Sequence, residues 1–209
     1  MITTASDSQD SILRDITTLF NNGMPVEVDV TWGNGGFWKS LPAPRIRVDR
    51  ETKPGVNVLA DVRSLPFGVG VIQSAIFDPP FLHAPGKASI MGNRFGGYKT
   101  QRDLQAMYRA AITELARVIA PGGLLVVKCQ DCIESGKQHW NHIVIFEALR
   151  ESFFIEDLFI LNRPINPIEG RNHKVQQHAR KNHCYFWIAR RMKQTTLKRN
   201  LNGSSTAVL

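Results

Sequence analysis

The feature that most constrains this chain is an apolar run that stops abruptly at a carboxylate. Residues 69–77 are predicted to form a short buried strand, and the strand is followed at once by Asp78, Pro79, Pro80 and Phe81. Consecutive prolines donate no backbone hydrogen bond and hold φ near about −65°, so the strand must end there. Ligands of open α/β sheets bind at the carboxyl ends of the strands. We therefore expect Asp78 and Phe81 at the reacting end of an active site.

A glycine-rich turn follows an earlier predicted strand, residues 25–30. The turn contains Gly33 and Gly35, and glycine allows the backbone to approach a ligand more closely than other residues do. The alternative is a plain turn, because glycine-rich turns are common. Between this turn and the next strand, residues 37–44 contain two prolines and have room for little helix.

Two further predicted strands end in acids. Residues 45–48 lead into Asp49, and residues 56–60 lead into Asp61. In nucleotide-binding α/β folds, an acid at the end of the second strand accepts hydrogen bonds from ribose hydroxyls. Each acid alone could equally be a solvent-exposed loop residue. Together with Asp78, they predict one ligand site along one edge of a sheet.

The remaining pattern completes an α/β domain. Helical periodicity marks residues 8–20, 104–119 and 140–149, and further strands are predicted at 124–128, 154–161 and 183–190. We expect an N-terminal helix in residues 1–23, one main domain in 24–191, and a basic, disordered tail in 192–209.

Composition limits the class of protein. The chain has 209 residues, of which 43% are hydrophobic and 21% charged, as in an ordinary globular domain. No apolar run reaches the length of about 18 residues that a membrane helix needs, and the polar N-terminus is unlike a signal peptide. Three cysteines do not indicate a disulfide framework, so we expect a cytoplasmic protein. The net charge of +8 favours a polyanionic partner.

Two long basic loops are candidates for contact with such a partner. Residues 82–103 are predicted to form a mobile lid and residues 163–181 a phosphate-contacting loop, with disorder without function as the alternative. The expected nucleic-acid ligands are Lys87, Arg94, Lys99, Arg171, Lys174 and Arg180. We expect no metal site, because the pair formed by Cys129 and Cys132 has no second pair.

The order of glycine-rich turn, acid, acid and Asp-Pro-Pro-Phe resembles that of Rossmann-like class I methyltransferases that use S-adenosyl-L-methionine. The last motif is similar to that of amino methyltransferases of nucleic acids, above all the small DNA adenine-N6 methyltransferases of phages and prophages. The resemblance covers about residues 26–190. It implies a seven-stranded, mostly parallel sheet with a C-terminal β-hairpin.

The resemblance also implies roles for individual residues. The methionine part of the cofactor would be lined by Asp29, Thr31, Gly33 and Gly35. Asp49 would hold the ribose hydroxyls, and Asp61 with the backbone of Val62 would face the adenine of the cofactor. At the target, Asp78 and the Pro79 carbonyl would accept hydrogen bonds from the amino group, Pro80 would stiffen the turn, and Phe81 would stack on the base.

The chemistry of an exocyclic amino group explains such a site. Its nitrogen lone pair is delocalised into the ring, so the nitrogen is a poor nucleophile. Two acceptors placed on its hydrogens draw it toward tetrahedral geometry and free the lone pair, so the catalysis is mostly positioning and electrostatics. In a duplex the base must first leave the stack, at a cost of a few kcal/mol.

Several alternatives remain open at this stage. Cytosine-N4 methylation of DNA uses the same chemistry, and so does adenine-N6 methylation of ribosomal or transfer RNA. A non-catalytic nucleic-acid-binding module is a further alternative, as is a chance Asp-Pro-Pro turn in another α/β protein. DNA is favoured over RNA by the resemblance alone, and the oligomeric state is not predicted.

Overall fold

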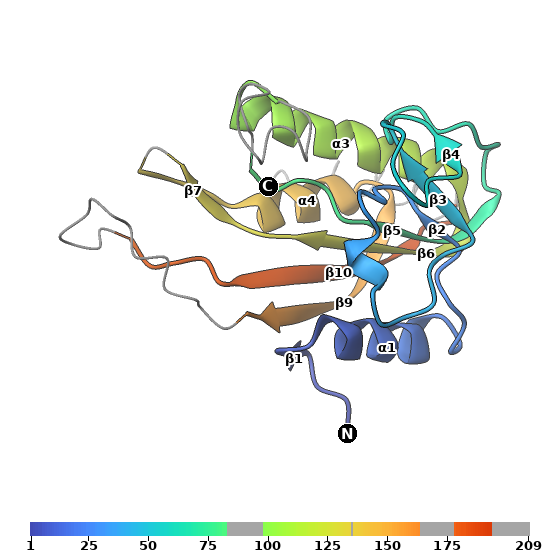
Figure 1. The fold of residues 1–209 in the computed structure, drawn as a ribbon, viewed down its shortest axis with the longest axis horizontal. Helices are drawn as coiled ribbons and strands as arrows, with labels where there is room; N and C mark the ends of the chain where they lie inside the picture. The colour runs from blue at the N-terminus through green and yellow to red at the C-terminus, as the bar shows by residue number, and fades with distance from the viewer. Residues whose placement is uncertain (83–97, 135, 164–177, 194–209) are drawn as a thin grey trace, which may run out of the picture.

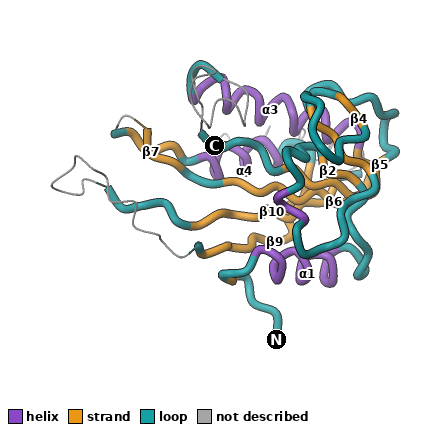
Figure 2. Tube along the Cα trace, viewed as in Figure 1, coloured by secondary structure: helices purple, strands orange, loops and turns teal. Residues whose placement is uncertain are grey.

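The structure is a computed structural model, which describes residues 1–82, 98–134, 136–163 and 178–193. An eight-stranded sheet forms the centre of the molecule, with helices on both faces (Figures 1 and 2). Its strands lie in the order β1 (Ala5–Ser6), β9 (Phe153–Asn162), β10 (His183–Arg191), β6 (Ile119–Cys129), β5 (Ile72–Phe77), β2 (Val28–Asp29), β3 (Ile46–Asp49) and β4 (Val58–Leu59). A separate antiparallel hairpin consists of β7 (Cys132–Glu134) and β8 (Lys137–His139), and it projects beyond the sheet in Figure 1.

The sheet is parallel except where β10 lies between β9 and β6. The chain places β3 and β4 on one side of β2, and it then returns to place β5 on the other side. Val28 of β2 pairs with Ile46 of β3 and with Ala75 of β5. Such a reversal of strand order opens a crevice beyond the carboxyl ends of the strands, where ligands bind.

One face of the sheet is covered by α3 (Gln101–Val118) and α4 (Asn141–Leu149). A capping box starts α3, because the Thr100 hydroxyl accepts from the Asp103 N–H while the Asp103 carboxylate accepts from the Thr100 N–H. Leu104, Tyr108 and Leu115 then bury one stripe of the helix completely. That stripe packs on the side chains of β5 and β6 and fixes α3 beside their carboxyl ends.

The opposite face is covered by α1 (Gln9–Phe20) and by the short 3₁₀ helix η1 (Gly36–Trp38). The Ser8 hydroxyl caps α1, and Ile12 and Ile16 are fully buried against the sheet. The crossover of residues 37–44 contains no regular helix beyond η1, as its prolines predict. Phe37 and Trp38 are buried in the core on this face of the sheet.

The predicted fold class is confirmed, including the antiparallel pair β9 and β10 near the C-terminus. The prediction of seven strands is wrong by one, because β1 adds a parallel strand beside β9. The strand predicted at 69–77 starts at Ile72, since the side chains of Val69 and Val71 are 76% and 52% exposed. None of the helices in the described ranges has the length and apolarity that a membrane crossing requires. From residue 194 onward, the predicted tail lies outside the described residues.

Candidate active site

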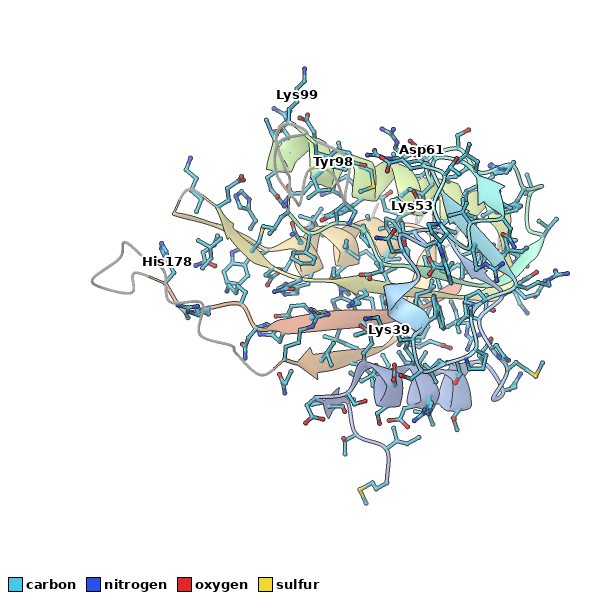
Figure 3. The ribbon with its side chains drawn as sticks, viewed as in Figure 1. Lys39, Lys53, Asp61, Tyr98, Lys99 and His178 are labelled. Atoms are coloured by element: carbon cyan, nitrogen blue, oxygen red, sulfur yellow. The ribbon has the colours of Figure 1, made fainter. Side chains whose placement is uncertain are left out.

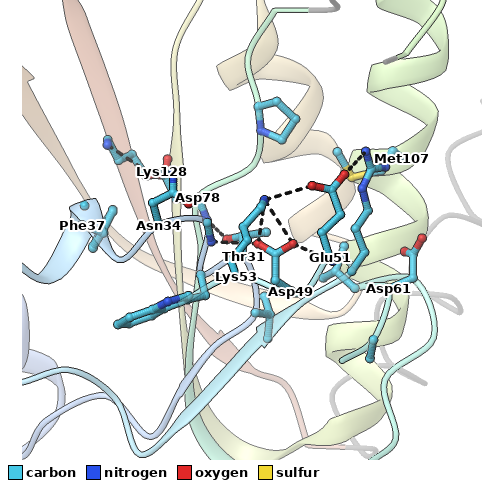
Figure 4. Close-up of a pocket in the computed structure, with 18 of the residues that line it drawn as sticks. Thr31, Asn34, Phe37, Asp49, Glu51, Lys53, Asp61, Asp78, Met107 and Lys128 are labelled. Carbon is cyan, nitrogen blue, oxygen red and sulfur yellow. Dashed lines mark hydrogen bonds and ion pairs between the residues drawn. The ribbon is translucent and has the colours of Figure 1, made fainter. Parts of the chain in front are cut away.

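The carboxyl ends of β2, β3, β4, β5 and β6 surround a cavity of about 580 Å³ (Figure 4). This volume is within the range of small-molecule and cofactor sites. Of the residues that the sequence predicted for the site, the cavity is lined by Thr31, Gly33, Asp49, Asp61, Val62, Asp78 and Pro80. Segments that are far apart in the sequence therefore meet at one place.

The glycine turn after β2 forms one wall. Gly33 and Gly36 line the cavity, and a Cβ atom added at either would meet no protein atom closer than 4.0 Å. Gly35 has a different role, because its φ is +68° and an added Cβ would lie 2.7 Å from the Trp32 ring. Gly33 and Gly36 thus keep the cavity open, whereas Gly35 allows Trp32 to pack on the turn.

Asp29 lies beneath this turn and does not line the cavity. Its side chain is buried, and it accepts hydrogen bonds from the Thr31 N–H at 2.8 Å and from Nε1 of Trp38 at 2.7 Å. Burial raises the pKa of Asp29 to about 7, although both hydrogen bonds lower it. Asp29 therefore supports the turn from below. The resemblance had implied a different role, direct contact with the cofactor.

Asp49 and Glu51 provide carboxylates at the end of β3. Asp49 is nearly buried and accepts from the Gly33 N–H at 2.8 Å, from the Glu51 N–H at 3.0 Å and from Nζ of Lys53 at 3.3 Å. Glu51 also lines the cavity, and Nζ of Lys53 lies 3.6 Å from its carboxylate (Figure 4). The sequence analysis missed Glu51 and Lys53 because they lie in a loop with no periodic pattern.

Asp61 and Val62 line the cavity beyond β4. Both carboxylate oxygens of Asp61 bind the Arg63 guanidinium, at 2.9 and 2.6 Å. This pairing lowers the pKa of Asp61 and keeps it ionised. Tyr98 and Met107 line the cavity as well, the first just before α3 and the second on it. The resemblance implied that Asp61 faces the adenine of the cofactor. In the structure, Asp61 forms an ion pair with Arg63 and lines the cavity together with the apolar side chains of Val62 and Met107.

The Asp-Pro-Pro-Phe segment is held by three neighbouring elements. The Asp78 N–H donates to the Thr31 hydroxyl at 2.8 Å. The Tyr108 hydroxyl donates to the Pro80 carbonyl at 2.5 Å, and Nδ2 of Asn141 donates to the Phe81 carbonyl at 3.1 Å. Within the described residues, the Pro79 carbonyl accepts no hydrogen bond. The segment is therefore rigid, yet the Pro79 carbonyl stays available as an acceptor.

Lys128 at the end of β6 is the partner of Asp78. Its Nζ lies 3.3 Å from Oδ2 of Asp78 and faces the ring of Phe37 at 4.9 Å. Lys128 is only 7% exposed, while the Asp78 side chain is 31% exposed at the cavity. Burial raises the pKa of Asp78, and the Lys128 ammonium opposes that rise. One signal in the sequence could have identified Lys128: a lysine directly after the apolar run that forms β6.

The other predicted site residues lie elsewhere. Phe81 comes directly after Pro80, which lines the cavity, but Phe81 itself does not line it. Lys99 points into solvent near the start of α3 (Figure 3), and Arg180 is exposed before β10. The four remaining basic residues, Lys87, Arg94, Arg171 and Lys174, lie outside the described residues.

The cysteines are buried and unpaired. Burial raises the pKa of all three thiols, that of Cys132 to about 11, so they remain protonated at neutral pH. Among the described residues, no group of three or more His, Cys, Asp or Glu side chains is placed to bind a metal ion.

The comparisons identify a fold and no closer relationship. The sequence matches no protein-family model and no curated protein. The structure is similar to 1,6-didemethyltoxoflavin-N1-methyltransferase of Burkholderia thailandensis, solved with bound 1,6-didemethyltoxoflavin and S-adenosylhomocysteine, with a TM-score of 0.54 and 15% identity over 87% of this chain and 78% of that one. It is also similar to the N-methyltransferase NodS of Bradyrhizobium japonicum, solved with S-adenosyl-L-homocysteine, with a TM-score of 0.50 and 10% identity over 86% and 85%.

A third similarity is to TTHA0409 of Thermus thermophilus, which is provisionally described as a DNA modification methylase. It was solved with S-adenosyl-L-methionine and has a TM-score of 0.45 and 20% identity over 68% of this chain. This chain spans 59% of the length of that protein. The fold is that of the Rossmann-like class I methyltransferases.

Proposed function

We propose that this chain is a methyltransferase that uses S-adenosyl-L-methionine to methylate the exocyclic N6 of adenine in DNA. The observation that carries the proposal is the acceptor pair at the end of β5. Asp78 presents a carboxylate at the cavity, and the adjacent Pro79 carbonyl has no hydrogen bond within the described residues. An amino group has two N–H donors, and these two acceptors match them in number.

The cavity is suited to the cofactor. Gly33 and Gly36 leave space that any side chain would fill. Asp49 and Glu51 place carboxylates where ribose hydroxyls need acceptors, and Val62 offers an apolar wall for a purine. When bound, S-adenosyl-L-methionine supplies a methyl group activated by a sulfonium sulfur.

The residues of the chain then act on the acceptor. Asp78 and the Pro79 carbonyl hold the amino hydrogens, and this hold frees the nitrogen lone pair for bond formation with the methyl carbon as the carbon–sulfur bond breaks. The methylated nitrogen is cationic and acidic, so its proton leaves readily to the Asp78 carboxylate. The Lys128 ammonium favours the ionised form of that carboxylate and so opposes the rise in pKa that burial causes. Positioning and electrostatics of this kind supply most of the rate enhancement.

A nucleic-acid substrate is supported by charge and by the Asp-Pro-Pro-Phe motif. The chain carries a net charge of +8, and Lys39, Arg50 and Arg163 lie around the cavity. RNA adenine and DNA cytosine are the alternative acceptors. A non-catalytic binding module would give no role to the pair of Asp78 and Lys128, which favours the enzyme. A nucleic acid as substrate also agrees with the expected cytoplasmic location.

Nucleoside mass spectrometry tests the proposal. The purified protein is incubated with S-adenosyl-L-methionine and, separately, with unmethylated duplex DNA, single-stranded DNA and total RNA. We expect N6-methyldeoxyadenosine from DNA and a loss of about 10²-fold to 10³-fold in rate in Asp78→Ala, as when a transition-state hydrogen-bonding group is removed. Calorimetry should show that the variant still binds the cofactor.

Other products would redirect the proposal. N6-methyladenosine in RNA alone, or N4-methylcytosine in DNA, would change the substrate and leave the chemistry of Asp78 intact. If no methylated nucleoside forms in any sample and the cofactor does not bind, the enzyme proposal is wrong.

A further inference from the structure

A group of aromatic and basic side chains lies beside the cavity without lining it. It consists of Trp140 and His142 at the start of α4, and of Lys181 and Tyr185 at the start of β10; we call it the Trp140 platform. Trp140 is 47% exposed, and Nζ of Lys181 lies 4.3 Å from the centroid of its ring. None of these four residues takes part in the proposed transfer.

The rings of the platform are held from below. His142 stacks on Tyr185 with ring centroids 4.4 Å apart and an interplanar angle of 21°. Nδ1 of His142 lies 2.8 Å from the carboxylate of Asp131, which is only 1% exposed. The indole of Trp140 meets the His142 ring edge to face at 6.3 Å. Trp140 is therefore the member of the platform that is exposed to solvent, with its edge fixed by His142 and the Lys181 ammonium over one face of its ring.

The platform is connected to the Asp-Pro-Pro-Phe segment. Asn141, the residue after Trp140, is fully buried and donates to the Phe81 carbonyl at 3.1 Å. Tyr185 lies on β10, two strands from the end of β5, and Asp78 follows β5. Strands are spaced by about 4.8 Å, so the backbone of Tyr185 lies roughly 10 Å from that of Asp78, and Trp140 follows beyond His142.

The charge around the platform suits a nucleic acid. Lys137, Arg163 and Arg180 are the further cations on the adjoining segments. In the connection between β6 and α4, Asp131 is buried beneath His142, and the Glu134 carboxylate lies 3.7 Å from His139. Phosphates approaching this side therefore meet mainly positive charge. An exposed aromatic face with a neighbouring cation matches a nucleotide, which has both a π-face and an anion.

We propose that the Trp140 platform binds the single-stranded nucleotides that flank the target base. One flanking base stacks on Trp140, and a neighbouring phosphate lies near Lys181. The proposal rests on the proposed function, because it needs a nucleic-acid substrate. It requires unpaired bases, since the faces of paired bases are covered within a duplex. A target that is extruded or already single-stranded has such neighbours.

Fluorescence anisotropy without cofactor tests the binding. The full chain is titrated against a fluorescein-labelled single-stranded DNA 15-mer or its RNA equivalent, an oligonucleotide of roughly the length that such binding folds cover. Trp140→Ala should weaken binding about tenfold, the usual order for loss of one stacked base, whereas Trp140→Phe should retain most of it. Ile143→Ala is the matched control, because Ile143 is 45% exposed on the same helix and lies outside the platform. Lys181→Gln should lower the salt slope of log K by about one.

Steady-state kinetics separates this proposal from the proposed function. Trp140→Ala should raise KM for the oligonucleotide about tenfold and leave kcat nearly unchanged, because the platform acts on binding alone. If the wild type methylates DNA or RNA and Trp140→Ala binds the oligonucleotide as the wild type does, the platform proposal is overturned and the enzyme proposal stands. It is also overturned if Trp140→Phe binds no better than Trp140→Ala or if the wild type binds no oligonucleotide. If the wild type binds the oligonucleotide but methylates no nucleic acid, the proposed function fails, and the anisotropy series still decides on the platform.

Discussion

The two halves of the site, each taken as the cavity wall with the residues directly beneath it, hold their carboxylates in different ways. In the half built by β2 and β3, Asp29 and Asp49 accept hydrogen bonds from backbone N–H groups of the adjoining turns. In the half built by β5 and β6, Asp78 forms an ion pair with Lys128, and the charge of Arg163 also favours its ionised form. The first half is a preformed scaffold whose acceptors are largely used. The second half holds a charged acceptor that can still receive a donor.

This difference explains why burial has different consequences in the two halves. Burial raises the pKa of both Asp29 and Asp78. Asp29 has only neutral donors, so its carboxyl group takes up a proton at mildly acidic pH. Asp78 has an ammonium group at 3.3 Å that stabilises its ionised form. A carboxylate that supports a turn tolerates protonation, whereas a carboxylate that accepts an amino hydrogen does not.

Removing Lys128 should produce the largest effect on activity, because it removes the cation that distinguishes Asp78 from Asp29. Lys128→Met keeps the aliphatic stem among Phe37 and Phe186 and deletes the charge. The pKa of Asp78 should then rise, so the acidic limb of the pH profile of kcat/KM should move to higher pH. We expect kcat/KM at pH 7 to fall by up to about tenfold for each unit by which the pKa of Asp78 rises, the full factor applying where that pKa lies above the working pH. Lys128→Arg should restore much of the acidic limb.

Lys53→Met is the matched control in the other half. Lys53 also bonds a carboxylate at 3.3 Å, but that carboxylate belongs to Asp49. Its loss should weaken cofactor binding and leave the pH profile unchanged. An identical pH shift in both variants would show that Lys128 acts only through the general charge of the cavity.

The sequence predicted the fold and the strand ends because both depend on local patterns. Apolar runs indicated the central strands, and the acids and prolines after them indicated one edge of the sheet. Lys128, Tyr108 and Asn141 escaped notice because their roles depend on contacts with residues 78 to 81, which lie 28 to 60 positions away in the chain. The strand β1 was missed for a related reason, since two residues next to polar neighbours have no pattern apart from their pairing with β9.

Asp29 predicts a pH dependence of stability. Its folded pKa of about 7 lies above the ordinary value of 3.8 for an aspartate, so between these values only the folded protein keeps the proton. Unfolding then releases a proton, and the contribution of Asp29 to stability falls as pH rises toward about 7. Asp29→Asn removes this dependence. Relative to the wild type, the variant should gain about 2–3 kcal/mol between pH 5 and pH 8, at about 1.4 kcal/mol per pKa unit.

Urea unfolding at the two pH values gives the measurement, and Asp61→Asn is the contrast. Asp61 has a lowered pKa because of Arg63, so its contribution is lost as the pH falls and not as it rises. A constant difference between Asp29→Asn and the wild type would show that Asp29 is ionised in the folded protein throughout this range.

The smallest effects should separate two glycines of the same turn. Gly35→Ala introduces a Cβ at a φ of +68° and at 2.7 Å from the Trp32 ring. We expect a loss of about 1–2 kcal/mol in the free energy of unfolding, the usual cost of a left-handed conformation for an L-residue. Gly36→Ala meets no atom within 4 Å and should leave stability unchanged. Because Gly36 lines the cavity, its methyl group should weaken cofactor binding roughly tenfold, which corresponds to about 1.4 kcal/mol of lost affinity.

Urea unfolding and calorimetry with S-adenosyl-L-methionine measure the two effects on the same pair of proteins. The expected result is a crossed pattern, in which Gly35→Ala loses mainly stability and Gly36→Ala loses mainly affinity. Equal losses of affinity would mean that the turn acts as one rigid unit, so that any change in it reaches the cofactor. A crossed pattern would instead locate the cofactor-facing side of the turn at Gly36, because a single methyl group at that position removes cavity volume and leaves the packing of Trp32 intact.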